Sequence, residues 1–210
     1  MHQTVNCLLC KLKKTLIRIK CIELHKKSME FALILVAAAV FALVHILNGW
    51  MFQWVEISNH ISWVYLPAFL RLFYVLVLGR VNAFIAIFTG GVLLATQFSE
   101  PGIVMLANNV CAGLAPVLAS IAVERWNQRS IGLDSIRDLL QLSILYCLLN
   151  ALLHHVVWLI VDPSQWREPV QIAGMVMGDF FGCLIGVGLM KAAIDRFGLP
   201  AWRTPNKHSD

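Results

Sequence analysis

The sequence predicts an all-α integral membrane protein, a bundle of six transmembrane helices with both termini in the cytoplasm (N-in/C-in). The 210-residue chain is 59% hydrophobic and only 14% charged, whereas soluble domains carry about 25% charged residues. Its apolar residues are gathered into six long runs, and a membrane-spanning helix needs roughly 20 such residues. This composition excludes an ordinary soluble enzyme, a disordered protein and a nucleic-acid-binding domain.

The six runs are separated by short connectors, several of which contain turn residues. We expect the spans at about 30–48, 61–78, 81–97, 103–123, 136–161 and 170–193. The connectors at 99–102, 132–134 and 162–164 contain Gly, Pro, Ser and Asp, which favour turns. No connector is long enough to hold a folded domain, so the sequence predicts one membrane domain over 29–194. A cytoplasmic flank, 1–28, precedes it and a cytoplasmic tail, 195–210, follows it.

The orientation follows from the distribution of positive charge. All 17 Lys and Arg residues except Arg71 and Arg167 lie in or beside the 1–28 flank, the second and fourth connectors or the C-terminal tail. Loops rich in Lys and Arg stay in the cytoplasm. Tryptophans prefer the membrane–water interface, and five of them fall near predicted outer ends: Trp50, Trp54, Trp63, Trp158 and Trp166.

The 1–28 flank is basic, with Leu and Ile between the charges. This pattern is typical of an amphipathic helix on anionic lipid, or of a flexible positive flank that only sets topology. A third interpretation is that translation starts at Met29. Cys7 and Cys10 form a C-x-x-C pair, but no second pair completes a zinc site, so we expect no metal.

Two charged residues fall deep inside predicted spans, away from the span ends, where unpaired charge is costly. Arg71 and Asp179 both lie roughly 14–15 Å below the outer surface if each residue rises about 1.5 Å. Their opposite signs and matching depths predict an ion pair across the bundle. The pair is either architectural or part of a ligand-binding or proton-handling site.

Four further polar residues lie in the outer halves of the predicted spans: Asn108, Asn109, His154 and His155. Hydrocarbon offers them no hydrogen-bond partners, so we expect them to converge with Arg71 and Asp179 on a polar cavity open to the outside. The alternative is a set of separate interhelical hydrogen bonds. The sequence contains no nucleotide-binding loop or hydrolase motif, and we predict no catalytic residue and no cofactor.

Small residues mark expected sites of close helix packing. Four glycines recur at four-residue spacing in the sixth span, at 174, 178, 182 and 186, and Ala38 and Ala42 form a similar pair in the first. Pro67 falls within the second predicted span, where it removes one backbone hydrogen bond and is expected to kink the helix.

Three motifs give the chain a family resemblance. They are WVYLPA at 63–68, NN at 108–109 followed by AGL at 112–114, and GDFFG at 178–182. With these motifs, the region 60–190 resembles the bacterial MASE-type integral membrane sensor domains. The resemblance implies that Asp179 and the region of Pro67 are sensing elements. Members usually carry an output domain after their spans, whereas a short tail follows residue 193 here.

The function we expect is that of a bacterial inner-membrane, sensor-like protein in signal transduction. It would bind a small molecule or partner from the periplasmic side and act through another protein. The alternatives are a substrate-binding subunit of a vitamin-type transporter and an accessory subunit of a larger membrane complex. The expected partners are the lipid bilayer and a signalling enzyme, transport subunits or a membrane complex, but no nucleic acid. We do not expect an enzyme.

Overall fold

The structure is a computed structural model that describes residues 2–58, 61–95, 102–131, 135–161, 163 and 169–197. Within these ranges side chains are described from residue 23 onward, except at 58, 169, 191, 193–195 and 197. The chain divides into two units, Met1–Val36 and Ala37–Asp210. The features discussed below all lie within the second unit.

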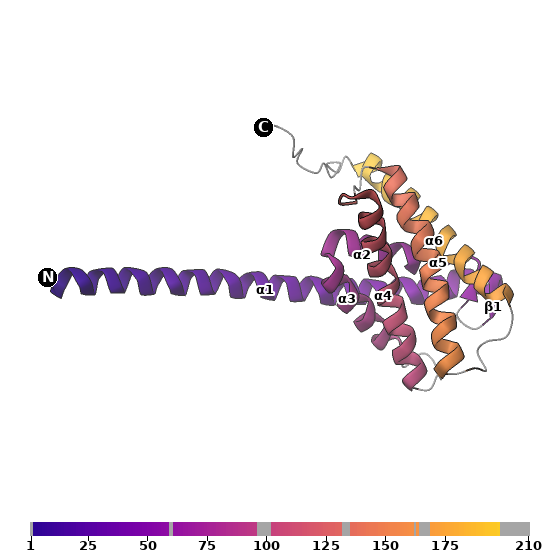
Figure 1. Ribbon diagram of the computed structural model, residues 1–210, viewed down its shortest axis with the longest axis horizontal. Coiled ribbons are helices and arrows are strands. Elements are labelled where there is room, and N and C mark those ends of the chain that lie inside the picture. Colours follow the sequence, from indigo (N-terminus) through magenta and orange to yellow (C-terminus); the bar gives the residue numbers. More distant parts are fainter. Residues whose placement is uncertain are drawn as a thin grey trace. The chain divides into compact units, whose positions relative to one another are not determined.

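Helices make up most of the described chain. The elements in order are α1 (His2–Phe52), η1 (Gln53–Val55), β1 (Glu56–Ser58), β2 (Ile61–Ser62), α2 (Pro67–Leu78), α3 (Arg80–Leu93), α4 (Gly102–Asn127), α5 (Ile136–Val161) and α6 (Pro169–Phe197). The two short strands pair antiparallel. In the second unit α5 packs between α4 and α6, and α2 packs against both α3 and α6 (Figure 1).

Four helical segments of the described chain are long and apolar enough to cross a membrane: Glu23–Val55, Gly102–Asn127, Ile136–Val161 and Val170–Met190. They coincide with four of the six predicted spans. The other two helices are shorter than predicted. At about 1.5 Å per residue, α2 and α3 extend roughly 18 and 21 Å, less than the roughly 30 Å of a bilayer's hydrocarbon core. A bundle of six full-length spanning helices is therefore not what the structure shows.

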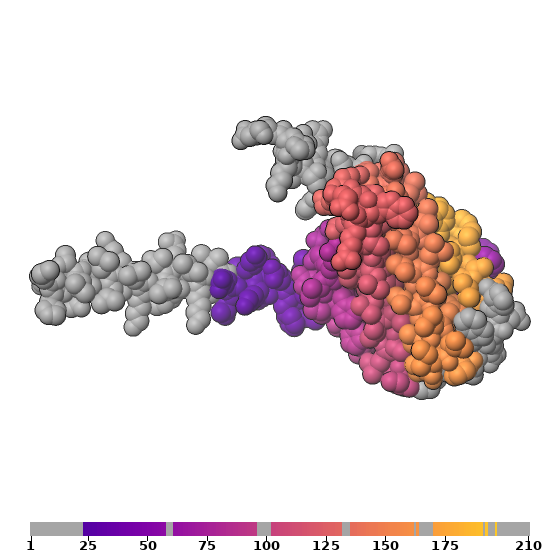
Figure 2. All heavy atoms as spheres, in the orientation of Figure 1, coloured from indigo at the N-terminus to yellow at the C-terminus, as the bar shows by residue number. Residues whose placement is uncertain are grey.

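The buried and exposed faces of α5 have the distribution of polar residues expected of a helix in a membrane. Buried residues recur at four-residue spacing along the helix: Asp138, Leu142, Tyr146, Asn150, His154 and Trp158. All of them except Leu142 carry a polar group. From residue 140 onward the exposed residues of α5 are all aliphatic: Leu140, Ile144, Leu148, Leu152, Val156, Leu159 and Ile160. Figure 2 shows side chains of α4 and α5 covering much of one face of the second unit. An aliphatic exterior around a polar interior is the reverse of a soluble helix and suits a multi-pass membrane protein.

Only the last two thirds of the second predicted span are helical, which corrects the prediction of a continuous helix over 61–78. Residues 63–66 lie outside any helix or strand, and α2 begins at Pro67. Proline is favourable at the first helical position because its missing N–H would have no partner there. Pro67 therefore starts a helix, and the predicted kink inside a longer helix was wrong. The Leu66 N–H is satisfied instead by the Asn48 side chain, at 2.8 Å.

The glycine stripe of α6 explains how an extended backbone is accommodated inside the bundle. A side chain at Gly178 or Gly182 would collide with the carbonyl oxygen of Ser62 or Tyr65. The Tyr65 N–H in turn donates to the Gly178 carbonyl oxygen at 3.0 Å. Irregular backbone is tolerated at membrane depth only where protein surrounds it. The sequence predicted close approach along this stripe. At Gly178 and Gly182 the partner is the 61–66 segment rather than a helix.

The turn between α2 and α3 lies level with the end of α4. Gly79 adopts φ +79°, a left-handed conformation suited to glycine. Arg80 directly after it forms an ion pair with Glu124 and donates to the Ser120 hydroxyl at 3.1 Å. Both partners belong to the last two turns of α4. At the other side of the bundle, Ala38 of α1 packs closely against Gly90 of α3.

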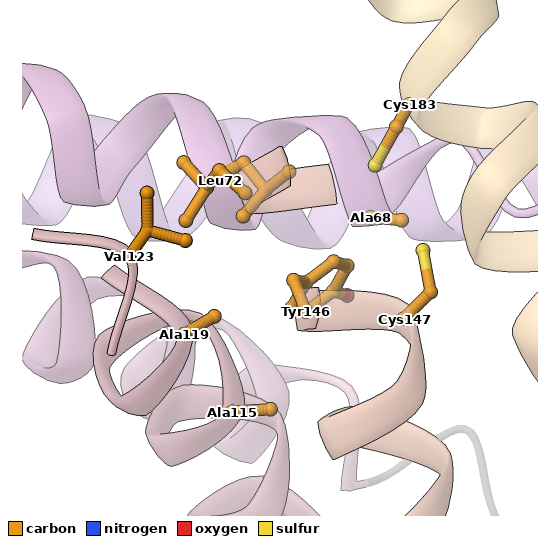
Figure 3. Packing of buried hydrophobic residues seen from close by; sticks show 9 residues of the cluster. Ala68, Leu72, Ala115, Ala119, Val123, Tyr146, Cys147 and Cys183 are labelled. Carbon is orange, nitrogen blue, oxygen red and sulfur yellow. The ribbon is translucent and has the colours of Figure 1, made fainter. Parts of the chain in front are cut away.

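The apolar core lies between α2, α4, α5 and α6 (Figure 3). Small residues such as Ala115 and Ala119 bring α4 close to its neighbours. Cys147 of α5 and Cys183 of α6 point their sulfur atoms toward one another. Some sequence-based predictions lie outside the described residues: the side chains of Cys7 and Cys10, the 99–101 and 132–134 connectors, Trp166, Arg167 and the tail from 198 onward.

Candidate functional site: a polar cavity around Arg71

Arg71, in the first half of α2, is held by three neutral acceptors, one from the segment before α2 and two from α5. Its Nη2 donates to the Tyr65 hydroxyl at 2.9 Å, and its Nη1 donates to the Tyr146 hydroxyl at 3.2 Å and to Asn150 Oδ1 at 3.3 Å. The guanidinium also lies over the rings of Phe41 and Tyr65, with its central carbon 5.6 and 5.1 Å from their centroids. Such cation–π contacts stabilise a desolvated cation. Arg71 is only 6% exposed.

Asn150 joins Arg71 to the buried carboxylate. Its Oδ1 accepts from Arg71, and its Nδ2 donates to Asp179 Oδ2 at 2.7 Å. Asp179 is 2% exposed. Among the described side chains, ion pairs join Arg80 to Glu124 and Arg129 to Asp138, and none joins Arg71 directly to Asp179. The direct pair expected from matching depth is thus replaced by a bridge through one carboxamide. Asn150 lies between the charges because α5 packs against α6 there.

The network continues from Arg71 to α1 through Tyr65. The Tyr65 hydroxyl accepts from Arg71 and lies 3.0 Å from Nδ1 of His45. With its oxygen engaged by the guanidinium, the hydroxyl can donate its proton to that ring nitrogen. One chain of hydrogen bonds therefore links α1, α2, α5 and α6 through His45, Tyr65, Arg71, Asn150 and Asp179.

The histidines and asparagines of the outer ends occupy different positions. Trp158 Nε1 donates to Asn108 Oδ1 at 2.7 Å. His154 Nδ1 lies 2.9 Å from the Asn150 carbonyl oxygen. A carbonyl oxygen can only accept, so Nδ1 carries the proton and Nε2 is an acceptor in the neutral ring. His155 makes the equivalent contact to the Ala151 carbonyl oxygen at 2.8 Å. Trp158 is buried inside the bundle, so its indole N–H is satisfied by Asn108 rather than by water or lipid.

These groups surround one cavity of about 110 Å³. Five of the six residues predicted from sequence line it: Arg71, Asn108, Asn109, His154 and Asp179. His155 does not line it. Asn150, Tyr65 and His45 complete the polar lining, and the apolar walls come from Phe41, Ile61, Leu94, Met105, Trp158 and Met175. The lining thus draws on late α1, β2 with the segment after it, α2, late α3, early α4, late α5 and early α6.

Two buried donors that line the cavity have no hydrogen-bond partner. They are Arg71 Nε and Asn109 Nδ2. A buried polar group without a partner costs about 1–3 kcal/mol, and native proteins rarely leave one unmet. Gly91 makes room for the Asn109 side chain, because a Cβ there would collide with the Asn109 carboxamide. The site is therefore built around two donors that still need acceptors.

Two α5 side chains that accept hydrogen bonds from Arg71 were not among the site residues predicted from the sequence. Tyr146 and Asn150 sit at four-residue spacing with His154 on α5, and this periodicity was the signal that placed them on one face. Tyr65 carries no such signal, because it belongs to a segment that was expected to be helical. No cluster of three His, Cys, Asp or Glu side chains within the described ranges could hold a metal ion. The chemistry on view is hydrogen bonding and charge.

Comparisons of the chain with protein-family models, with curated proteins and with solved structures each found no match.

Proposed function

We propose that this chain is a small-molecule-binding, sensor-like protein of the bacterial inner membrane that acts through another membrane protein. The observation that carries the proposal is the cavity with two unpartnered buried donors, Arg71 Nε and Asn109 Nδ2. The resemblance of 60–190 to MASE-type sensor domains is consistent with it. A ligand that supplies acceptors to both donors would link α2 to α4, and binding would change the balance of contacts that a partner protein reads.

The proposed topology has six crossings with both termini in the cytoplasm. The non-helical segment 61–66 adds at most roughly 20 Å at about 3.3 Å per residue to the roughly 18 Å of α2. Together they are long enough to cross the bilayer. The Arg80–Glu124 pair supports this arrangement, because it sets the α2–α3 turn level with the last turns of α4. With this topology the cavity opens on the periplasmic side.

The transporter alternative receives less support. The cavity volume of about 110 Å³ is small compared with the roughly 300–1,000 Å³ of pockets that bind drug-sized ligands. Vitamins are ligands of drug size. In a transporter subunit the Ala38/Ala42 pair of α1 would suit docking to a transport partner, but both residues are buried in the bundle, and Ala38 packs against Gly90. The remaining alternative, an accessory subunit of a larger complex, is distinguished by its copurifying partner.

Native mass spectrometry of the full chain, released from nanodiscs made with its own membrane, tests the binding function. We expect a bound small molecule on the wild-type protein and its loss in Ala112→Leu, because Ala112 lines the cavity. Ala107→Leu adds the same bulk to α4 outside the lining and serves as the control. A wild-type protein without any bound small molecule would contradict the proposal. Crosslinking in membranes then separates a signalling enzyme from a transport ATPase or a respiratory complex as partner.

A further inference from the structure

The cavity holds one fixed positive and one fixed negative group, and neither is directly neutralised. Building on the proposed function, we propose that its ligand is a small zwitterion with an apolar body, such as an α-amino acid. The ligand carboxylate would bind Arg71 and Asn109, and the ligand ammonium would bind Asp179. The argument depends on which atoms of these residues are already used.

The free edge of Arg71 has the shape of a carboxylate site. Its three hydrogen bonds use Nη1 and Nη2, and all three acceptors are neutral. Nε remains without a partner, and the Arg71 side chain lines the cavity. In a guanidinium, Nε and the adjacent Nη present parallel N–H groups that match the two oxygens of a carboxylate. The unpartnered Nδ2 of Asn109 offers one more donor to the same group.

Asp179 supplies the opposite charge. Its hydrogen bond among the described residues is to Asn150 Nδ2, a neutral donor, through Oδ2. Asp179 also lines the cavity, where Arg71 is the single Lys or Arg in the described lining. A carboxylate in such a setting attracts an ammonium group, because opposite charges interact strongly where water is scarce.

Asn150 already displays the polarity that the ligand needs. It presents its oxygen to the cation and its nitrogen to the anion. The carboxylate and ammonium of an α-amino acid present the same order of acceptor and donor, with full charges in place of partial ones. The separation of acceptor and donor is only slightly longer in the ligand. Two carbons lie between its carboxylate oxygen and its ammonium nitrogen, and one carbon lies between the oxygen and the nitrogen of a carboxamide.

Charge balance disfavours the simpler ligand classes. A monocarboxylate would leave the cavity with one net negative charge and an amine with one net positive charge. Either would be costly to desolvate inside a bundle. A zwitterion preserves the balance between Arg71 and Asp179. The walls formed by Phe41, Met105 and Met175 suit an apolar side chain.

A matched ligand series tests this inference on the purified full chain in detergent, by isothermal titration calorimetry. Glycine, alanine, valine and leucine are compared with the acid that lacks each ammonium group and the amine that lacks each carboxylate. For valine these are 3-methylbutanoate and isobutylamine. We expect at least one amino acid to bind with a Kd at least tenfold below those of its acid and its amine. An acid or amine that binds as tightly as its amino acid, or no binding by any amino acid, would overturn the inference.

Variants separate recognition of the two charges. In Asp179→Asn the hydrogen bond to Asn150 can be kept while the negative charge is lost, so the amino acid should bind no tighter than its acid. Glu124→Gln makes the same chemical change in the Arg80–Glu124 pair and should keep the tenfold preference. A preference that survives Asp179→Asn would overturn the inference. Should that variant fail to fold, Asn109→Ala serves, since it should weaken amino acid and acid about fivefold or more and leave the amine unchanged. Equal weakening of all three would overturn it.

The native mass spectrometry experiment keeps the two proposals distinguishable. A bound small molecule without zwitterionic character, lost in Ala112→Leu, would overturn the ligand class and leave the binding function standing. A wild-type protein without any bound molecule, and with no response to the ligand series, would remove both.

Discussion

Asn150 is the residue on which the two buried charges depend. Its carboxamide makes one hydrogen bond to Arg71 and one to Asp179, and its backbone carbonyl oxygen accepts from His154. A buried charge that loses its partner is far more costly than a buried charge that keeps one. One neutral side chain therefore makes both charges tolerable in the bundle.

Replacing Asn150 with Leu should destabilise the protein by about 3 kcal/mol. The change roughly keeps the side-chain volume but removes the hydrogen bonds to Arg71 and Asp179. Each of these buried charged groups then lacks one hydrogen-bond partner. Thermal unfolding of the full chain in detergent measures the effect. Ser143→Ala, at a buried position of α5 away from the cavity, is the control and should cost less than about 1 kcal/mol. Equal effects of the two substitutions would contradict the bridging role.

The sequence predicted several of the residues that line the cavity but not the hydrogen bonds that they make. Depth arithmetic brought Arg71 and Asp179 to one level, and both line the cavity with Asn108, Asn109 and His154. Depth alone gives no rotation about a helix axis, so the direct pair was expected where Asn150 lies between. The role of Tyr65 depends on an extended segment, which hydropathy does not distinguish from a helix.

The elements α2 and α6 are fitted to each other by the glycine stripe. Gly174, Gly178, Gly182 and Gly186 lie against the chain between Ile57 and Phe69. This contact holds the 61–66 segment in place, and with it Tyr65 and the start of α2. Four-residue glycine spacing predicted a close contact, but two helices were the expected partners. The presence of an extended partner follows from Pro67, which favours a helix start.

Gly182→Ala should destabilise the bundle by several kcal/mol, because the new Cβ would collide with the Tyr65 carbonyl oxygen. Gly188→Ala is the matched control on the same helix, since nothing lies within 4 Å of its added Cβ. The control should be neutral or stabilising by up to about 1 kcal/mol, the helix-propensity difference between Ala and Gly. Chemical or thermal unfolding of both variants decides the point, and equal stability would contradict the packing described.

Oxidative crosslinking tests the register of α5 against α6. Cys147 and Cys183 face one another in the core (Figure 3), so copper-phenanthroline should join them. Mass spectrometry of tryptic peptides from the oxidised full chain should then show a 147–183 disulfide. Cys111, which is also buried, is the internal control and should stay reduced. A disulfide from Cys111 to either partner, in place of the 147–183 link, would contradict the register.

At the scale of the molecule, the described part of the chain combines four long apolar helices with two short ones. Hydropathy and charge distribution were sufficient to place the four long helices. They overestimated the second and third spans, because an extended segment and a short helix have the same composition as one long helix. The six-crossing topology is a proposal that rests on the Arg80–Glu124 pair and on the positive charges of the cytoplasmic connectors.

Cysteine accessibility tests that topology. In a cysteine-free background, Val81→Cys beside the α2–α3 turn should react with a membrane-impermeant maleimide in inside-out vesicles and not in intact spheroplasts. Ile103→Cys at the start of α4 should show the opposite pattern. Both positions are exposed at helix ends, so the maleimide can reach each of them from the side of the membrane on which it lies. Labelling of both from the same side would contradict six crossings.

The central claim is that the cavity around Arg71 is a binding site. The most direct measurement is a high-resolution cryo-electron microscopy map of the full chain in a nanodisc of its native lipids, with a rigid antibody fragment added for size. The account predicts non-protein density within hydrogen-bond distance of Arg71 Nε and Asn109 Nδ2. A closed, dry cavity in which protein groups satisfy both donors would contradict it.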